Sequence, residues 1–467
     1  MNPVRDKASG MSADSLASRA SNGVNAKAQF EGKKITVMGL GLLGGVGDIA
    51  ELAESGADII ATDLKSETEL KPSLDALAKY PNIRYTLGSH ELADFRDRDL
   101  IIKAPGTPAD SIYIAEARKQ GTPITMWAAL FAKFAREEGA TIVGITGTRG
   151  KTTVTEMLSS ILRAAGKQVI EGGNVRGTSL LPQLADVRES TIAVLELDSW
   201  KLQGFGEAKM SPQIAVFTTL YADHMNYYHD DMDAYLADKA NIFLYQTEED
   251  TLILGKQCAP TIIEKYGEQI ESKTLVIDEL KLPDTWTLQI LGAHNRYNAA
   301  LALAAARTLG VADETSRTAL AAFKGVPGRL ELVREVNGVK VYNDTTSTTP
   351  DATRAALQAL DTGARNIILI MGGSDKNLDM NTLLYEIPDF TKRVIMLAGT
   401  GTNRVLEFLP GASVFDDLKK AVDEAFVAAE AGDIILLSPA FASFGMFKNE
   451  YDRGDQFNAL VNAHAGK

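Results

Sequence analysis

The chain has a single cysteine among its 467 residues, Cys258, so no disulfide can form within it. This is typical of proteins in a reducing compartment, and we expect a cytoplasmic location. Positive charge is also scarce, because 48 Lys and Arg residues stand against 61 Asp and Glu residues, a formal net charge of −13. That balance argues against broad nucleic-acid binding, so an anionic ligand must be bound by locally placed cations and backbone N–H groups.

Long apolar runs are absent as well. No stretch approaches the ~20 residues that a membrane-spanning helix needs, so we expect no membrane partner. Residues 1–30 are rich in Ser, Ala and Asn, which predicts a disordered tail rather than a secretory signal. The total length suggests about three domains, and we place them at residues 31–137, 138–326 and 327–467.

Strand-like and helix-like segments alternate in all three regions. This alternation predicts an α/β fold with mostly parallel sheets. We expect a Rossmann-like N-terminal domain, a central P-loop ATPase-like domain and a Rossmann-like C-terminal domain.

The central region contains a candidate phosphate-binding loop. An apolar strand (residues 141–146) leads into a glycine loop, and a helical pattern follows from residue 154 to 163. In this context backbone N–H groups and the helix N-terminus bind phosphate, Lys151 reaches the terminal phosphates and Thr152 ligates Mg²⁺. The strict phosphate-loop pattern has Gly where this chain has Ile145. The alternative interpretation of the segment is a plain glycine-rich turn between a strand and a helix. The residues predicted to bind ATP here are Gly147, Thr148, Arg149, Gly150, Lys151, Thr152 and Thr153.

The first domain opens with a second glycine loop after the strand Lys34–Met38. Its residues are Gly39, Leu40, Gly41, Leu42, Leu43 and Gly44, with Asp63 about 20 residues further on. This pattern suits NAD or a different nucleotide equally well. A further strand, Leu100–Lys103, runs into residues 104–108, which form either a ligand-crevice loop or a structural turn.

Two side chains near strand ends, Glu196 and His224, are candidate metal ligands. Glu196 lies in an apolar strand, where a charge is costly unless it is paired or binds a metal, and capping by backbone N–H groups is the alternative. His224 follows another strand beside an acid, although a lone His is more often structural. Lys239 lies on an expected helix over residues 233–246, and its pattern by itself favours a surface lysine.

The rest of the chain adds polar loops. Asn295 and Asn298 share one face at the start of an Ala-rich helix and could bind a purine edge or a second loop. In the C-terminal region, strands end at residues 344–348, 372–376 and 438–443. Ligands bind outside the carboxyl ends of parallel strands, so these loops are expected to form a site wall.

At these residues the chain resembles the Mur ligases from about Lys34 to its C-terminus, and most closely the members that add D-glutamate to UDP-N-acetylmuramoyl-L-alanine. The motifs are 147–153, the Glu196 strand end, 223–225, Asn295 with Asn298, 328–329 with 343–344, and 437–440 with 447–449. The resemblance implies ATP-dependent ligation through an acyl phosphate, in cytoplasmic synthesis of peptidoglycan precursors. A related ligase adding L-glutamate or another amino acid is the alternative, and we expect a monomer.

The resemblance also implies roles for individual residues. Lys151, Glu196, His224 and Lys239 would be catalytic, and Thr152, Glu196, His224 and Lys239 would hold two Mg²⁺ ions, with Lys239 carbamylated by CO₂. Asn295, Asn298, Arg329 and Asp344 would complete the ATP site. The UDP-sugar would be bound by the loop Gly39–Gly44 and by Asp63, Leu64, Lys65, Pro105, Gly106, Thr107 and Asn174. Glutamate would be bound by Thr348, Lys376, Ser443 and Phe444.

The chain departs from the family pattern at several positions. Arg149 stands where the family has Asn, Asp198 replaces a Ser, Thr346 replaces a Lys, and Glu450 replaces an aromatic residue. The changes at the glutamate end leave the identity or chirality of the added amino acid open. Three other classes of protein are less consistent with the sequence. An NAD-binding protein would leave Lys151 and Glu196 unused, and a folylpolyglutamate-synthase-like ligase would lack the first domain. An inactive nucleotide-binding scaffold would not need the intact Lys151, Glu196, His224 and Lys239.

Overall fold

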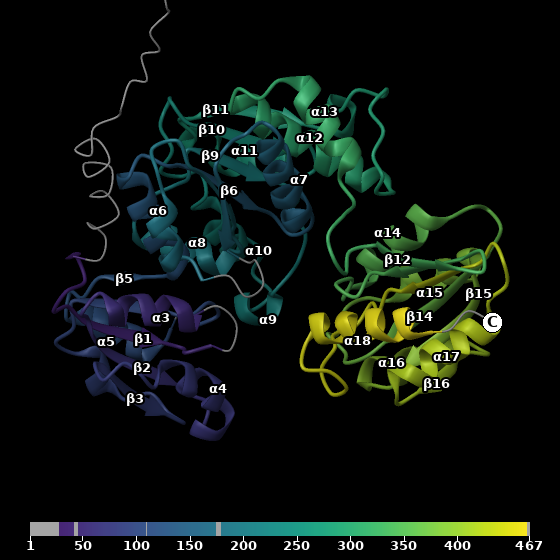
Figure 1. Ribbon diagram of the computed structural model, residues 1–467, viewed down its shortest axis with the longest axis horizontal. Coiled ribbons are helices and arrows are strands. Elements are labelled where there is room, and N and C mark those ends of the chain that lie inside the picture. Colours follow the sequence, from purple (N-terminus) through teal and green to yellow (C-terminus); the bar gives the residue numbers. More distant parts are fainter. Residues whose placement is uncertain (1–27, 42–44, 109, 174–178, 465–467) are drawn as a thin grey trace, which may run out of the picture. The chain divides into compact units, whose positions relative to one another are not determined.

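The computed structural model describes residues 28–41, 45–108, 110–173 and 179–464. Within these ranges the chain is an α/β fold whose strands form three sheets (Figure 1). It divides into two compact units. The first takes in the chain up to Ile277 together with Leu301–Ala312, and the second takes in Asp278–Ala300 and Asp313 onward. Each sheet lies inside one of the three predicted domains, whose exact bounds stay predictions.

The first sheet has five parallel strands in the order β3-β2-β1-β4-β5. Their bounds are β1 Lys34–Met38, β2 Asp58–Asp63, β3 Ile83–Leu87, β4 Leu100–Lys103 and β5 Ile124–Thr125. Buried side chains cover both faces, with Ile35 and Val37 in one apolar cluster and Met38 and Ile101 in another. The strand order reverses between β1 and β4, so the loops that follow these two strands share one edge.

The second sheet is also wholly parallel, in the order β11-β10-β9-β6-β8-β7. Its strands are β6 Thr141–Thr146, β7 Val169–Gly173, β8 Ile192–Glu196, β9 Ile214–Phe217, β10 Thr251–Gly255 and β11 Lys273–Ile277. The central strand β6 is a nearly continuous apolar run, as expected for a strand buried on both faces. Its register aligns Ile145 with Glu196 and Thr146 with Phe217, so the segments after β6, β8 and β9 emerge together.

The third sheet lies in the second unit in the order β12-β13-β17-β14-β15-β16. Its strands are β12 Glu331–Val336, β13 Val339–Asn343, β14 Ile367–Gly372, β15 Thr391–Leu397, β16 Ser413–Phe415 and β17 Ile434–Leu437. Only the β12–β13 pair is antiparallel among the pairs that the structure describes. Strands β13, β17 and β14 are neighbours, which brings their three polar end loops together.

Helices connect the strands and cover the sheets. In the first unit they are α3 Gly45–Glu54, α4 Glu67–Leu77, α5 Ile112–Lys119, α6 Trp127–Glu137, α7 Lys151–Ala164, α8 Ser199–Glu207, α9 Met225–Tyr228, α10 Met232–Ala240 and α11 Ala259–Tyr266. Further on are α12 Ala293–Thr308, α13 Asp313–Ala322, α14 Pro350–Leu360, α15 Asn381–Phe390, α16 Thr400–Val405, α17 Leu418–Ala428 and α18 Glu450–Ala463. Helix α10 ends at Ala240, six residues before the predicted end. None of the helices in the described ranges combines the length and the apolar composition needed to cross a membrane.

A buried carboxylate joins the first two sheets within the first unit. Asp48 lies on α3, is 3% exposed, and accepts hydrogen bonds from the backbone N–H groups of Leu180 (2.8 Å) and Leu181 (2.7 Å). Burial raises the pKa of Asp48 to about 7, although the two N–H donors favour its ionised form. The folded chain therefore holds a proton on Asp48 in a range of pH where the unfolded chain, with a pKa of 3.8, has released it.

This linkage predicts the pH dependence of one variant. In the native chain, Asp48 reduces stability progressively as pH rises from about 4 to about 7. Asp48→Asn keeps an acceptor for both N–H groups and stays neutral at every pH. We therefore expect the melting temperature of the variant, minus that of the native chain, to be larger at pH 8 than at pH 5. A difference between the two proteins that is the same at both pH values would contradict this assignment.

Candidate active site

The central loop is braced against the segment that follows β9. The backbone N–H of Thr148 donates to Thr219 O at 2.7 Å, and that of Arg149 donates to Thr219 Oγ1 at 2.9 Å. Gly147 has a φ of 136°, and a Cβ there would stand 2.0 Å from Thr218 Oγ1. The loop therefore depends on a glycine at this position. Its conformation and its place between a buried strand and α7 are those of the predicted phosphate-binding loop.

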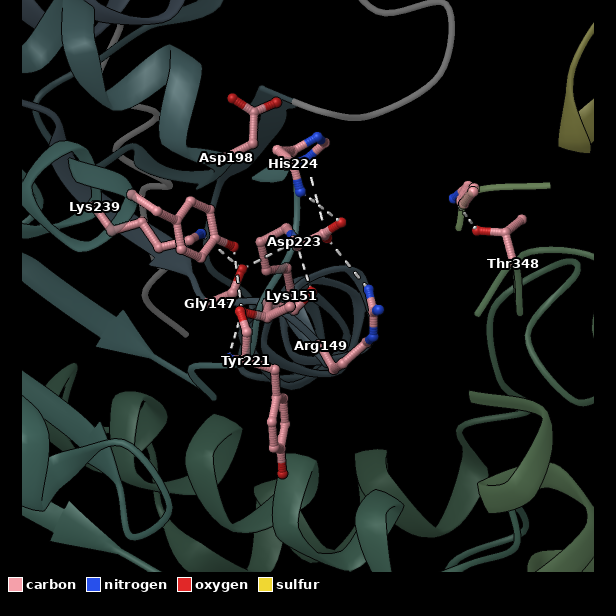
Figure 2. Close-up of polar contacts among 12 residues, drawn as sticks. Gly147, Arg149, Lys151, Asp198, Tyr221, Asp223, His224, Lys239 and Thr348 are labelled. Atoms are coloured by element: carbon pink, nitrogen blue, oxygen red, sulfur yellow. Dashed lines mark hydrogen bonds and ion pairs between the residues drawn. The ribbon is translucent and has the colours of Figure 1, made fainter. Parts of the chain in front are cut away.

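Two lysines point at this loop from different elements (Figure 2). Lys151 opens α7 and its Nζ donates to Gly147 O at 3.1 Å and Thr148 O at 3.2 Å. Lys239 comes from α10 and its Nζ donates to Gly147 O at 2.8 Å and Thr146 Oγ1 at 3.2 Å. Lys239 is only 1% exposed, so the surface position favoured by its sequence pattern is wrong.

Burial determines the protonation of these lysines. It lowers the pKa of Lys151, and the acids Glu196, Asp198 and Asp223 only partly offset the effect. The pKa of Lys239 lies well below its usual range, because burial and the neighbouring charge of Lys151 both disfavour its protonated form. Both effects favour the neutral amine form of Lys239.

Two acids lie at the end of the neighbouring strand β8. Glu196 is its last residue, is 3% exposed, and has an Oε2 atom with no hydrogen-bond partner. Backbone capping therefore does not account for this oxygen, and a buried carboxylate oxygen of this kind fits the role of a cation ligand. Asp198 caps α8 through the N–H of Lys201. Burial alone would raise the pKa of Asp198, but the Lys201 ammonium at 2.7 Å and that N–H hold it at about 2.

The segment after β9 carries a third acid and the predicted histidine. Asp223 Oδ2 lies 3.4 Å from Arg149 Nη1 and 4.0 Å from His224 Nε2 (Figure 2). The His224 ring packs on Trp200 with centroids 4.4 Å apart. Burial lowers the pKa of His224 despite the nearby Asp223, so the neutral imidazole, the form that binds metals, is favoured.

The predicted metal ligands do not form a cluster of ionisable ligands. Among the described residues, no group of three or more His, Cys, Asp and Glu side chains could hold a metal ion. The predicted set supplies only Glu196 and His224 of these types, beside the Thr152 hydroxyl and the Lys239 amine. An unmodified lysine is a poor metal ligand, so Lys239 could serve a Mg²⁺ ion only after conversion to an anion.

The first glycine loop is shaped by Asp63 at the end of β2. Asp63 Oδ2 accepts from Leu40 N and Oδ1 from Lys65 N, both at 2.9 Å. Gly39 and Gly41 have φ values of 96° and 64°, and Leu64 is 67% exposed beside them. Each oxygen of Asp63 is thus engaged in holding the loop. The predicted residues Leu42, Leu43, Gly44 and Asn174 lie outside the described residues.

The loop after β4 also faces the second sheet. Thr107 is buried and its Oγ1 donates to Ala104 O at 2.8 Å, which closes the turn around Pro105 and Gly106. A Cβ on Gly106 would stand 3.9 Å from the Trp200 ring. The two loops predicted to bind a sugar nucleotide therefore flank the reversal point of the first sheet.

The second unit brings the predicted glutamate-binding loops together. Lys376 Nζ, from the loop after β14, donates to Thr348 Oγ1 in the loop after β13 at 2.9 Å. Ser443 is buried, Phe444 is 65% exposed, and Ser374 Oγ donates to Phe444 O. This wall presents one exposed lysine among hydroxyl groups.

The remaining predicted ATP residues of the second unit are mostly held by their own surroundings. Asp344 accepts from Leu330 N at 3.0 Å and Ser438 Oγ at 2.8 Å, and burial raises its pKa to about 6. Asn298 Nδ2 donates to Asn295 Oδ1 at 3.3 Å, which confirms that the two amides share a helix face. Arg329 is half-buried and its backbone N–H donates to Val326 O at 3.0 Å.

The structure adds residues that the sequence did not single out. Tyr235 is 1% exposed and its hydroxyl lies 3.2 Å from Thr148 Oγ1. In the second unit, Arg453 is fully buried and its guanidinium donates to Thr345 Oγ1 (3.0 Å) and Thr345 O (2.8 Å). Both reach their loops from helices distant in sequence, so no local pattern could have identified them.

Comparison with known proteins gives two family matches. Residues 145–306 match the Mur ligase middle domain, and residues 328–441 match the Mur ligase, glutamate ligase domain. The UDP-N-acetylmuramoylalanine–D-glutamate ligase of Roseiflexus sp. (strain RS-1) is 38% identical, across 93% of this chain and 99% of that protein. The enzyme of the same name from Borreliella burgdorferi (strain ZS7) is 36% identical, across 91% and 97%.

Solved structures share the fold at low sequence identity. MurF ligase from Thermotoga maritima in complex with ADP has a TM-score of 0.59 at 19% identity, covering 94% of this chain and 97% of that chain. UDP-N-acetylmuramate-alanine ligase MurC from the same organism also has a TM-score of 0.59, at 18% identity, with coverage of 92% and 99%.

The central loop offers a direct test of its glycine. In Gly147→Ala, the new methyl group would meet Thr218 Oγ1 at 2.0 Å and Thr219 N at 2.8 Å, and both belong to the segment that braces the loop. We expect the affinity for a fluorescent ATP analogue to fall at least about tenfold, equivalent to about 1.4 kcal/mol.

The matched control is Gly166→Ala. Gly166 also has a positive φ, 70°, but its Cβ would meet nothing within 4 Å. It should cost about 1 kcal/mol of stability and leave the affinity for the analogue unchanged. Equal affinities in the two variants would argue against a role of the Gly147 loop in nucleotide binding.

Proposed function

The chain belongs to the Mur ligase family, and from that premise we propose that it is an ATP-dependent ligase that joins D-glutamate to UDP-N-acetylmuramoyl-L-alanine. The observation that carries the proposal is the placement of the Gly147 loop and Lys151 between two strand ends that bear acids, Glu196 and Asp223. This is an arrangement suited to a magnesium triphosphate. The names of the similar enzymes supply the two other substrates, and we place the reaction in the cytoplasm, as part of peptidoglycan precursor synthesis.

The chemistry begins with an unreactive carboxylate. Transfer of the γ-phosphoryl group of ATP to the L-alanine carboxylate gives an acyl phosphate and ADP. The glutamate amine then attacks the acyl carbon, loses a proton and expels phosphate through a tetrahedral intermediate. The task of the protein is to position the reactants and neutralise charge. The loop N–H groups and Lys151 serve the β- and γ-phosphates, and Arg149 adds a cation beside them.

Magnesium, when bound, would neutralise the phosphate oxygens and the charge that develops during transfer. Thr152, Glu196, His224 and Lys239 would hold it, as two ions in the family arrangement. The unpaired Oε2 of buried Glu196 and the lowered pKa of His224 fit this role. Lys239 fits after carbamylation: its neutral Nζ attacks the carbon of CO₂, a C–N bond forms and a proton leaves, which creates an anionic oxygen donor.

The substrates would bind at the three sets of strand-end loops. The diphosphate and uracil of the sugar nucleotide would lie on the first sheet, at residues 39–44, 63–65 and 105–107 and at Asn174. Adenosine would meet Asn295, Asn298, Arg329 and Asp344. The two carboxylates of glutamate need two donor sets, for which Lys376 with Thr348, and the loop of Ser443 and Phe444, are the candidates.

A second candidate is a Mur ligase that adds L-glutamate or another amino acid. The observation in its favour is the altered glutamate end of the chain, where Thr346 donates to Gly328 O and replaces the family's lysine. In the loops after β13 and β14, the charged side chain that contacts Thr348 is Lys376.

The function is tested by phosphate release from purified protein with Mg-ATP and UDP-N-acetylmuramoyl-L-alanine. We expect release with D-glutamate and little with L-glutamate, and mass spectrometry should find the ligated product. Release with L-glutamate alone would transfer the assignment to the second candidate, and no release with either enantiomer would refute both.

The lysine modification is tested by Lys239→Ala. Removal of a group that holds charge in the site should reduce kcat at least about 100-fold, with partial recovery when short carboxylates such as acetate are added. Lys265→Ala is the matched control: Lys265 lies in the same unit, pairs with exposed Asp233, and its loss should leave full activity. Unimpaired turnover of the Lys239 variant would remove this residue from the site.

A further inference from the structure

One face of α8 is attached to the first sheet and its helices. Trp200, Gln203, Gly204 and Glu207 recur at the i, i+3, i+4 and i+7 spacing of a single helix face. Trp200 packs on Gly106, and a Cβ on Gly204 would stand 2.8 Å from that of Met126. Glu207 pairs with Arg118, and Gln203 bonds Lys103. Because α8 begins directly after Glu196 and Asp198, this helix connects the reaction centre to the first sheet.

Gln203 is the centre of a polar network on this face. Its Oε1 accepts from Lys103 Nζ at 2.6 Å, while its Nε2 donates to Asp238 Oδ2 at 2.7 Å and to Tyr227 OH at 3.1 Å. Asp238 Oδ2 also accepts from Tyr228 OH at 2.9 Å. An ammonium can only donate and a carboxylate can only accept, so a group placed between them must accept on one side and donate on the other, as the Gln203 amide does.

The lysine end of the network is withdrawn from water. Lys103 is 5% exposed, and burial lowers its pKa. Asp238 is half-buried, and its Oδ2 accepts hydrogen bonds from both Gln203 and Tyr228. Two ionisable groups placed this way are costly unless their hydrogen bonds are complete, and breaking one link leaves the others unpaired. A hydrophobic residue would join the same elements at lower cost, so packing alone does not account for the network.

The network ends at two functional segments. Lys103 is the last residue of β4 and directly precedes the loop 104–107, whose Thr107 O accepts from Tyr227 OH at 2.9 Å. Asp238 directly precedes Lys239, which contacts Gly147 of the phosphate loop. The candidate sugar-nucleotide loop and the candidate phosphate-transfer centre are thus joined through one side-chain amide.

We propose that Gln203 is a positioning residue that fixes the register between the sugar-nucleotide loop and the phosphate-transfer centre. It does so by bridging Lys103 to Asp238. The proposal rests on the proposed function, because register matters only if a carboxylate carried on the first sheet must meet a phosphate carried on the second. Gln203 itself touches no reactant, and it acts through Lys103, Tyr227 and Asp238.

The test uses Gln203→Glu and Gln203→Met in the full chain. The first removes both amide donors and places a second carboxylate against Asp238, and the second removes all three bonds. A displacement of about 1 Å at a reaction centre costs roughly 100-fold in rate. We expect kcat to fall about 100-fold in both variants, while the dissociation constants of the ATP analogue and of UDP-N-acetylmuramoyl-L-alanine change less than about threefold.

A rescue variant and a structural readout accompany the kinetics. In Gln203→Glu with Asp238→Asn, donor and acceptor exchange places, so kcat should recover at least about tenfold over the single Glu variant. Hydrogen exchange of peptides covering residues 100–108 should be faster in both single variants and return toward the native rate in the pair. This measurement needs no substrate.

The matched control is Gln246→Glu. Gln246 is 3% exposed and donates to Pro212 O (2.9 Å) and Thr251 O (3.2 Å), away from the α8 face. It should lower the melting temperature but leave the exchange of residues 100–108 unchanged. It should also leave kcat within about threefold of the native value, as expected for a site with no shared partner.

The outcomes separate two failures. An inactive native chain, with altered exchange of residues 100–108 in the Gln203 variants, would refute the proposed function and leave only a structural bridge, so the positioning role would fall with it. An active native chain whose Gln203 variants keep kcat within threefold would overturn the positioning role alone. Two further results would also overturn it: an equal loss of kcat and of affinity for both ligands, or an equal loss of kcat in Gln246→Glu. In either case general destabilisation of the protein would explain the loss of activity.

Discussion

The placement of two lysine amines against the backbone of one glycine loop is the constraint on which the site depends. Lys239 and Lys151 both direct their Nζ atoms at Gly147 O, and neither is neutralised by direct contact with a carboxylate in the contacts that the structure describes. The compensating acids Glu196, Asp198 and Asp223 act at longer range from the ends of two other strands. A loop surrounded in this way has an excess of hydrogen-bond donors. That excess favours the binding of a polyanion at the loop.

Strand order explains how these groups meet. Strand β6 lies between β8 and β9, so the loop after β6 emerges between the acid of β8 and the histidine that follows β9. The same principle places the loops of β1 and β4 together in the first sheet, and those of β13, β17 and β14 together in the third. In each case, residues far apart in sequence become neighbours because parallel strands end at a common edge.

The first unit also shows how two sheets are held in one arrangement. Helix α8 starts at the candidate active site, carries an apolar and a polar contact to the first sheet, and packs beside α10, which bears Lys239. Hydrogen-bonded polar groups such as buried Asp48 and half-buried Gln203 have few alternative partners, so they specify a single arrangement where apolar packing would permit several. Precise alignment of two reactants is what a ligation of two bound substrates requires.

The sequence by itself determined the local features: the strand Leu100–Lys103 at its observed bounds, the strand–loop–helix at Gly147, the parallel α/β class and the family motifs. These follow from short-range periodicity and from glycines that adopt positive φ. It could not determine the burial of Lys239, the end of α10 at Ala240, the engagement of Asp63 by backbone N–H groups, or the bridge through Gln203. Only the tertiary structure decided those, because solvent exposure and hydrogen-bond partners depend on elements that lie tens of residues away along the chain.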